Sequence, residues 1–561
     1  MLQRLREWNR ARIDARRGQR SAGTDAEYAQ WVRKHDTITE AARVGLLQRA
    51  RRITHGPRIS ILMPVFDPNP AWLAEAIDSV RAQLYVNWEL CIADDASTDP
   101  RVRDILAQAA TQDARIRVHW RARNGHICAS SNAALALATG PYIALLDHDD
   151  VLPEHALLCV AEAILRTPDA DVLYSDEDKI DARGRRHGPY FKRNWNAELL
   201  RGQNYISHLG VYRTQLVREV GGFRAGFEGS QDYDLALRCT ERSTPARIVH
   251  IPHVLYHWRV HAQSTASDVA AKPYAPDAGV RALQDHLNRT HARGDAFLRD
   301  GSYHVLYHLP MPWPSIAMVL LDVGGRWTLR RALRRIAGAA DLHVISTRAR
   351  AHGWPHIGWH RAHGGVRPRA CNALIASLRA DVIVLLDSDC LPESWNALHP
   401  LIAHAVQPGV AAAGPRVVSG KYVVGTAMVG SDGGLVPWGE GGRARSGGYF
   451  GRAALSQDVE ALGRGCVVFQ RRVFESVGGF TSGGDDFDTA IVDTTLRMAT
   501  GTRRNRWVPS VTCTHPGQKP KSDAPDAPDA GNPNLRWHHH RVAYADPPRV
   551  SWSVPYTADG G

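Results

Sequence analysis

The stretch Tyr142-Ile143-Ala144-Leu145-Leu146-Asp147-His148-Asp149-Asp150 decides which fold this chain is expected to adopt. An apolar run that ends in clustered carboxylates is typical of a buried strand that opens into a cleft at its carboxyl end. Carboxylate oxygens are the hard ligands that Mg²⁺ and similar cations prefer. Acids also follow ordinary strands as solvated turns, so the surrounding sequence has to distinguish a metal site from such a turn.

Two more strands are predicted before this stretch, with helical sequence between them. Residues 58–66 are apolar and β-branched, and residues 72–84 then repeat apolar side chains at helical spacing. Residues 88–93 form another apolar run, which ends in Asp94 and Asp95. This alternation predicts an α/β fold with a mostly parallel sheet, in which ligands bind outside the carboxyl ends of the strands.

Short motifs recur in a fixed order between residues 58 and 265. They are Pro64-Val65-Phe66, Asp94-Asp95-Ala96-Ser97, Arg123-Asn124-Gly125, Asn132, Asp147-His148-Asp149-Asp150, Tyr174-Ser175-Asp176-Glu177-Asp178, Gly221-Gly222-Phe223, Gln231-Asp232-Tyr233-Asp234 and Leu255-Tyr256-His257-Trp258-Arg259. The ordered set resembles the inverting glycosyltransferases of family 2, which have the Rossmann-like GT-A fold. The resemblance covers a span of the size expected for one domain.

The resemblance implies a role for each matching position. Asp95 contacts the nucleobase, Pro64 and Arg123 bound the nucleotide, Asp147 and Asp149 handle ribose and metal, Asp150 can replace either of them, His257 adds a metal or diphosphate contact, Arg259 neutralises phosphate, and Asp232 is the general base. The implied cofactor is Mg²⁺ or Mn²⁺.

The chemistry of glycosyl transfer calls for these residue types. When the sugar leaves a nucleoside diphosphate, negative charge develops on the β-phosphate, and a cation held by carboxylates stabilises it. The acceptor hydroxyl is a poor nucleophile near neutral pH, and a positioned carboxylate that takes its proton contributes on the order of 10²–10⁴ in rate. One displacement with one base and no covalent intermediate inverts the anomeric carbon.

Some of these residues also have structural interpretations. Asp232 stands where a helix begins and is a candidate helix cap. His257 is one of 27 histidines, so clusters around it arise by composition. Asp176, Glu177 and Asp178 are either a ligand contact or a solvated charged face.

The second half of the chain repeats the first. Val382-Ile383-Val384-Leu385-Leu386-Asp387-Ser388-Asp389 echoes the opening stretch, and both Asp387 and Asn372 lie 240 positions after their counterparts Asp147 and Asn132. A glycine-rich motif at 477–480 and the acids at 485–488 continue the match. The sequence therefore predicts two GT-A-like domains in tandem.

The second copy has diverged from the first. Leu342-His343-Val344-Ile345-Ser346-Thr347 stands where Asp94 and Asp95 end the corresponding strand, and His515 falls near the position of His257 without the following Trp-Arg. Asp387, Asp389 and Asp486 are kept, as a metal and a base require. The copy is either a transferase with altered donor recognition or a degenerate partner that binds glycan; the sequence leaves both open.

Composition restricts the class of protein further. The chain has 561 residues, a formal net charge of +12 and eight cysteines, none in a close CxxC pair, which predicts reduced core thiols. No apolar run approaches the length of a membrane span, and no signal peptide is evident, so we expect a soluble, cytoplasmic protein. Arginines crowd the N-terminus, which is either a solvated tail or a peripheral contact with an anionic inner-membrane surface. No nucleic-acid-binding motif is present.

The predicted domains follow from these patterns. They are a basic helical extension (1–57), a GT-A domain (58–265), a helical linker (266–314), a second, diverged GT-A-like domain (315–515) and a flexible tail rich in Pro and Asp (516–561).

We expect a metal-dependent hexosyl- or rhamnosyltransferase of the polysaccharide or O-antigen type. It would move a sugar from a nucleotide-sugar donor to a glycan or lipid-linked acceptor. The alternatives are a non-catalytic carbohydrate- or membrane-associated scaffold, and a bifunctional transferase in which both domains act.

Overall fold

The computed structural model describes residues 25–261, 274–323, 325–348, 354–362, 368–425, 427–431, 434–481 and 486–516. The basic tail at 1–24 and nearly all of the predicted flexible tail, 517–561, lie outside these residues. The chain forms two compact units: of the described residues, unit 1 holds 25–195 and 204–286, and unit 2 holds 196–203 and 287–516.

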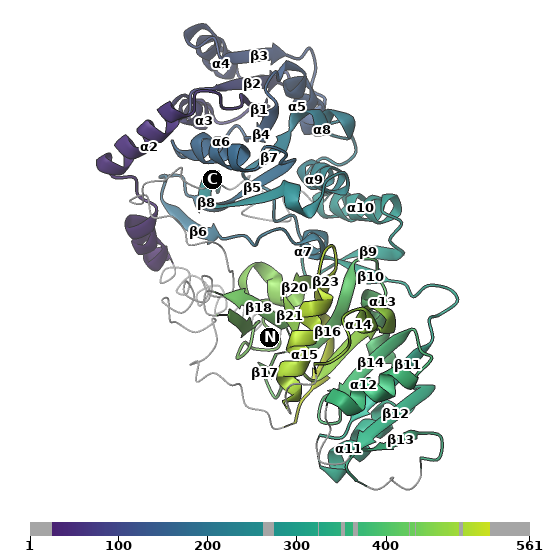
Figure 1. The fold of residues 1–561 in the computed structure, drawn as a ribbon. Coiled ribbons are helices and arrows are strands. Elements are labelled where there is room, and N and C mark those ends of the chain that lie inside the picture. The colour runs from purple at the N-terminus through teal and green to yellow at the C-terminus, as the bar shows by residue number, and fades with distance from the viewer. Residues whose placement is uncertain are drawn as a thin grey trace, which may run out of the picture. The chain divides into compact units, whose positions relative to one another are not determined.

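Unit 1 is built on one mixed sheet with the strand order β3-β2-β1-β4-β7-β5-β6, and β8 pairs with β5 (Figure 1). Its strands are β1 (Ile59–Val65), β2 (Trp88–Asp94), β3 (Ile116–Trp120), β4 (Tyr142–Leu145), β5 (Val172–Ile180), β6 (Arg186–Tyr190), β7 (Gly210–Arg213) and β8 (Ile248–Arg259). The first four strands in this order run parallel, and β7 is antiparallel to β4. The predicted α/β fold is thus confirmed.

Helices connect and cover these strands. They are α2 (Glu40–Arg52), α3 (Pro70–Arg81), α4 (Pro100–Gln112), α5 (His126–Leu137), α6 (Ala156–Arg166), α8 (Thr214–Glu219), α9 (Gln231–Glu241) and α10 (Tyr274–Arg289), with a short 3-10 turn, η1 (Pro245–Arg247). In α3, Leu73, Ile77 and Val80 recur at helical spacing and pack in one buried core with the alternate side chains of β1. Asn69 caps this helix by accepting a hydrogen bond from the Ala71 amide.

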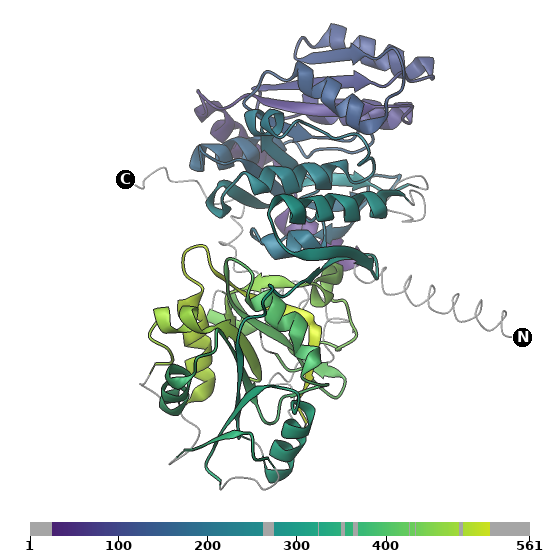
Figure 2. The ribbon, with the colours of Figure 1, turned by 90° about the vertical axis from the view of Figure 1, so that its right-hand side faces the viewer.

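Unit 2 repeats the architecture of unit 1. Its main sheet has the order β13-β12-β11-β14-β22-β16-β23-β15, again with four parallel strands followed by an antiparallel one. The strands are β11 (Ile316–Leu321), β12 (Asp341–Ser346), β13 (Gly358–Arg361), β14 (Val382–Asp387), β15 (Leu391–Pro392), β16 (Val410–Ser419), β22 (Cys466–Gln470) and β23 (Arg504–Thr514). Figure 2, turned by 90°, shows helices flanking the strands of each unit.

The remaining elements of unit 2 surround this sheet. The helices are α7 (Ala197–Gly202), α11 (Arg326–Arg335), α12 (Pro368–Ser377), α13 (His399–Ala405), α14 (Arg471–Ser476) and α15 (Phe487–Met498); the smaller strands are β17 (Tyr422–Val423), β18 (Ala427–Ser431), β19 (Gly434–Pro437), β20 (Gln457–Val459) and β21 (Ala461–Leu462). The segment predicted as a helical linker contains α10 and also an antiparallel hairpin, β9 (Gly294–Arg299) and β10 (Ser302–Tyr307).

An asparagine clamp occurs at the same place in both units. The Asn132 side chain accepts a hydrogen bond from the Phe223 amide (2.9 Å) and donates one to the Phe223 carbonyl (2.7 Å). Asn372 makes the same two bonds with Phe480, at 2.9 and 2.8 Å. Because topology and clamp recur together, the predicted tandem repeat is confirmed.

Two further features of the structure concern the cysteines and the helices. All eight cysteines are buried and free of disulfides, as predicted. Within the described ranges, no helix combines the length and apolar character that crossing a bilayer requires.

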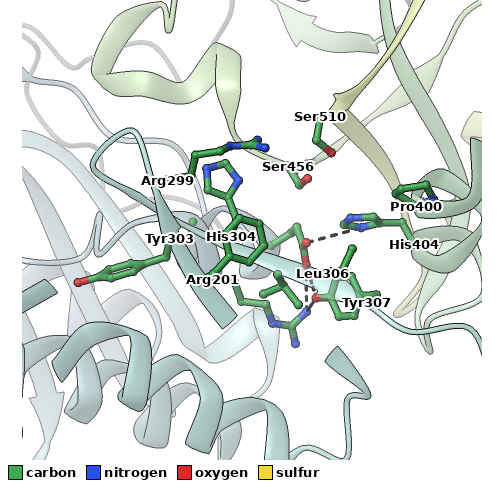
Figure 3. Close-up of a pocket in the computed structure, with 14 residues that line it drawn as sticks. Arg201, Arg299, Tyr303, His304, Leu306, Tyr307, Pro400, His404, Ser456 and Ser510 are labelled. Atoms are coloured by element: carbon green, nitrogen blue, oxygen red, sulfur yellow. Dashed lines mark hydrogen bonds and ion pairs between the residues drawn. The ribbon is translucent and has the colours of Figure 1, made fainter. Parts of the chain in front are cut away.

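Unit 2 contains a cavity of about 220 Å³ between α7, the β9–β10 hairpin and α13 (Figure 3). The buried Glu198 carboxylate lies 3.0 Å from Arg201, 3.2 Å from Arg506 and 3.7 Å from His404. Burial opposes ionisation of Glu198, but the two arginines outweigh it and lower its pKa to about 2. Burial also lowers the pKa of His404 to about 4, although Glu198 opposes that shift.

The lowered pKa of His404 predicts acid-sensitive stability for unit 2. In the unfolded chain a histidine takes up a proton near its ordinary pKa of 6.5, whereas folded His404 takes one up only near 4, so the free energy of unfolding falls as pH drops from 6.5 to 4. The loss is at most about 3 kcal/mol. We expect His404→Gln to reduce the fall in the free energy of unfolding of unit 2 between pH 7 and pH 5. Urea unfolding, followed at unit 2 by pulsed hydrogen exchange of the β22 amides, measures this free energy. The exposed His356→Gln is the control, and an equal decline in both variants would contradict the assignment.

Candidate functional site

Two carboxylates and an imidazole lie close together at the carboxyl end of β4, a central strand of the unit 1 sheet. Asp147 and Asp150 follow β4, and His208 precedes β7, the antiparallel neighbour of β4. Because β4 and β7 run in opposite directions, the end of one and the start of the other lie side by side. Each of the three residues offers a ligand atom, and these atoms lie within 4.8 Å of one another.

Asp150 is the buried member of this group, which we call the Asp-Asp-His cluster. Its carboxylate accepts hydrogen bonds from the Tyr256 hydroxyl (2.6 Å) and the Arg259 amide (2.7 Å). Burial raises the pKa of Asp150 well above its usual range, and repulsion from Asp149 and Asp147 adds to the rise. A carboxylate whose ionisation is opposed in this way favours a nearby cation.

The donor set of the Asp-Asp-His cluster fits a divalent metal. Two carboxylate oxygens suit Mg²⁺ and Mn²⁺, and an imidazole nitrogen beside them suits a transition metal such as Mn²⁺. The residues present therefore fit the cofactor that the family resemblance implies.

His208 is held in place from two sides. Its backbone amide donates to the Glu177 carboxylate (3.2 Å), which also accepts from the Ser207 hydroxyl (3.1 Å) and from the Lys192 ammonium (3.0 Å). The His208 ring stacks on Tyr256, with the ring centres 4.5 Å apart. Sequence reasoning missed His208; its only signal is its place just before the strand that returns beside β4.

Asp232 lies in the first turn of α9 and accepts a hydrogen bond from the side-chain amide of Asn204 (2.7 Å). Burial raises its pKa; the nearby His208 opposes the rise and Asp147 adds to it. These interactions place Asp232 beside the Asp-Asp-His cluster. The N-cap of α9 is Ser230, so Asp232 is not the cap that its position in the sequence also allowed.

Three residues predicted for metal or phosphate have other contacts. Asp149 lies 2.9 Å from His261, and the His257 ring lies 2.5 Å from Asp178. The guanidinium of Arg259 donates to Glu75 (2.5 Å) and to the Asp149 carbonyl (2.8 Å). The structure thus groups Asp147 and Asp150 with His208 and leaves Asp149 and His257 outside the cluster.

The residues predicted to surround the nucleotide lie along the same strand ends. Asp95, which is 2% exposed, accepts hydrogen bonds from Arg121 (2.6 Å) and from the Gly125 amide (3.1 Å). The carbonyl of Pro64 lies 3.1 Å from the His148 ring, which joins β1 to the acidic loop after β4. Arg123 is exposed. The roles predicted for Pro64, Asp95 and Arg123 stay predictions.

The acidic run of β5 is neither a solvated face nor an open binding surface. Asp178 accepts hydrogen bonds from the Tyr28 hydroxyl (2.7 Å) and from Arg186 (2.5 Å), and Asp176 lies 2.8 Å from His250. Both carboxylates are buried; Asp178 joins the N-terminal helix, which is helical at residues 25–35, to the sheet, and Asp176 joins β5 to β8. They have a structural function.

The acids predicted for unit 2 are paired with basic groups or with backbone. Asp387 accepts a hydrogen bond from Arg464 (2.8 Å), and Asp389 lies 3.2 Å from His515. Burial raises the pKa of Asp387 to about 6, although Arg464 opposes the rise. Asp486 caps α15 by accepting from the amides of Asp488 and Thr489.

Comparison with known proteins places unit 1 in a family. Residues 60–221 match the family described as glycosyl transferase family 2. The chain is 38% identical over 514 residues to the uncharacterised protein y4gI of Sinorhizobium fredii, and 31% identical over 486 residues to the O-antigen biosynthesis protein RfbC of Myxococcus xanthus. These matches cover 86% and 81% of this chain, so they extend well beyond the family match.

The chain spans 55% of the length of y4gI and 37% of the length of RfbC. A crystal structure of Staphylococcus aureus TarS (residues 1–349) in complex with UDP matches 41% of this chain and 71% of its own, with 20% identity and a TM-score of 0.32. A similarity this limited carries no information about the ligands of this chain. The motifs, the sheet topology and the family match agree, and the chain contains a glycosyl transferase family 2 domain at residues 60–221.

Proposed function

We propose that unit 1 transfers a sugar from a nucleoside diphosphate donor to a hydroxyl of a glycan or lipid-linked acceptor, with inversion, in the assembly of a cell-surface polysaccharide. The observation that carries this proposal is the Asp-Asp-His cluster at the carboxyl end of β4 with Asp232 beside it. The similarity to an O-antigen biosynthesis protein supports the proposed role in polysaccharide assembly.

In this proposal Asp147, Asp150 and His208 hold Mg²⁺ or Mn²⁺. A divalent cation bound there stabilises the charge that develops on the departing diphosphate. Asp149, which lies next to the cluster and pairs with His261, orients the ribose. Asp95, Pro64 and Arg123 bound the base and the sugar of the nucleotide, and buried Arg259 holds the Asp149 loop through its carbonyl.

Asp232 takes the proton from the acceptor hydroxyl. Burial raises its pKa, which makes it a stronger base than an ordinary carboxylate. The Asn204 amide, 2.7 Å away, fixes the orientation of the carboxylate. One base without a covalent nucleophile gives a single displacement and therefore inversion.

If the acceptor is lipid-linked, it lies at a membrane surface. A lipid-linked acceptor brings the enzyme to an anionic inner surface, and the net charge of +12 supports peripheral binding there. Of the arginines before β1, Arg43 and Arg49 pair with Glu154 and Glu162 of unit 1, which leaves this contact to other basic residues.

Calorimetric titration with UDP, dTDP and GDP, with and without Mn²⁺, tests whether unit 1 binds a donor. We expect metal-dependent binding of one nucleotide, and Asp147→Asn should weaken it at least about tenfold because a metal ligand is lost. Asp104→Asn, which changes an exposed acid on α4, is the matched control and should bind normally. Absence of binding in the wild type would instead favour the non-catalytic scaffold.

The role of Asp232 is tested by Asp232→Asn, which keeps the shape of the side chain. We expect release of nucleoside diphosphate from the preferred donor to fall by about 10²–10⁴ because the base is lost, while the nucleotide affinity stays within about threefold. Asp486→Asn, in the helix cap of unit 2, is the control. Near-normal turnover of Asp232→Asn would refute the assignment of the base.

A further inference from the structure

In unit 2 an arginine in the loop before β22 contacts the acid at the end of β14. The Nε atom of Arg464 donates to Asp387 (2.8 Å), and its Nη1 atom lies 3.0 Å from Asp488. Asp387 is the counterpart of Asp147 in the repeat. Its charge is therefore neutralised by a side chain of the same unit.

Strand pairing shows which residue replaced His208. Ala144 of β4 pairs with Val211 of β7, and Val384, 240 positions after Ala144, pairs with Val468 of β22. Counting back three positions from Val211 and from Val468 aligns His208 with Gly465, the residue after Arg464. Unit 2 has thus lost the imidazole and gained a guanidinium in the same loop.

The counterpart of Asp150 is Cys390, again 240 positions later. Cys390 is fully buried in an apolar core that also contains Cys466 and Cys513. In the described part of unit 2, no three histidine, cysteine or acidic residues bring ligand atoms as close together as in the Asp-Asp-His cluster.

Two arginines that make the same contacts in the two units, Arg238 and Arg497, show which residue of unit 2 corresponds to Asp232. In α9, Arg238 donates to the carbonyls of Val220 and Gly222. In α15, Arg497 donates to the carbonyls of Val477 and Gly479, which belong to the repeated glycine motif.

Each arginine also pairs with an acid four positions earlier, Asp234 or Asp493. This register aligns Asp232 with Ile491, an apolar residue that is 3% exposed. The motif match had placed Asp486 there, but Asp486 lies before α15 and caps it. Unit 2 therefore has no carboxylate at the position of the base.

From these substitutions we infer that unit 2 holds neither a divalent cation nor a nucleoside diphosphate, and that Arg464 takes the place of the cation. A metal at Asp387 would have to displace the guanidinium from that carboxylate and leave it with Asp488 alone, which opposes binding. The chain then has a single transfer centre, in unit 1; this last step rests on the proposed function.

Counting bound Mn²⁺ by electron paramagnetic resonance, with saturating UDP and again without nucleotide, tests the inference on the full chain. We expect one Mn²⁺ per chain, lost in Asp147→Asn. Asp389→Asn should leave the count at one. Asp389 is the informative variant in unit 2, because one of its carboxylate oxygens has no hydrogen-bond partner in the described structure and is the remaining candidate ligand there.

The outcomes separate the inference from the proposed function. Two ions per chain, one of them lost in Asp389→Asn, would overturn the inference and leave the proposed function of unit 1 intact. One ion that is lost in Asp389→Asn but kept in Asp147→Asn would overturn both. No bound ion would support the inference for unit 2 and contradict the metal site proposed for unit 1. Protection of the β22 amides from hydrogen exchange shows that unit 2 of Asp389→Asn is folded.

Discussion

Charge balance at the end of the central strand is the constraint on which both units depend. β4 and β14 each deliver carboxylates into a partly or fully buried loop, where ionisation is opposed by burial and by repulsion between neighbouring acids. Such a loop needs a positive partner. Unit 2 supplies one from its own residues, Arg464, whereas the fully buried Asp150 of unit 1 accepts hydrogen bonds only from the Tyr256 hydroxyl and the Arg259 backbone amide in the described structure.

The antiparallel strand beside the central strand controls this difference. β7 and β22 begin at the same edge at which β4 and β14 end, so the residues just before them face the acids. In unit 1 this position holds His208, which the Glu177 carboxylate anchors through the backbone. In unit 2 a glycine stands there and the preceding arginine reaches the acid. The loop before the antiparallel strand thus determines whether the acids have a histidine beside them, as in unit 1, or form an ion pair with an arginine, as in unit 2.

Sequence patterns were sufficient for the features that depend on local periodicity. Apolar strands ending in acids, helical spacing and an offset of 240 residues gave the α/β fold and the tandem repeat. They did not reveal His208, because a single histidine before a strand carries no signal until the strand's antiparallel pairing is known. The motif match also placed Asp486 in register with Asp232, whereas the contacts of Arg238 and Arg497 give Ile491. The buried pairing of Asp178 with Tyr28 joins segments 150 residues apart, which periodicity cannot connect.

Anomalous diffraction at the manganese edge, from crystals soaked in MnCl₂, tests the central claim most directly because it locates the ion. The account predicts one anomalous peak per chain, within bonding distance of Asp147, Asp150 and His208. A peak at Asp387, or a peak held by Asp149 and His257 without His208, would contradict it.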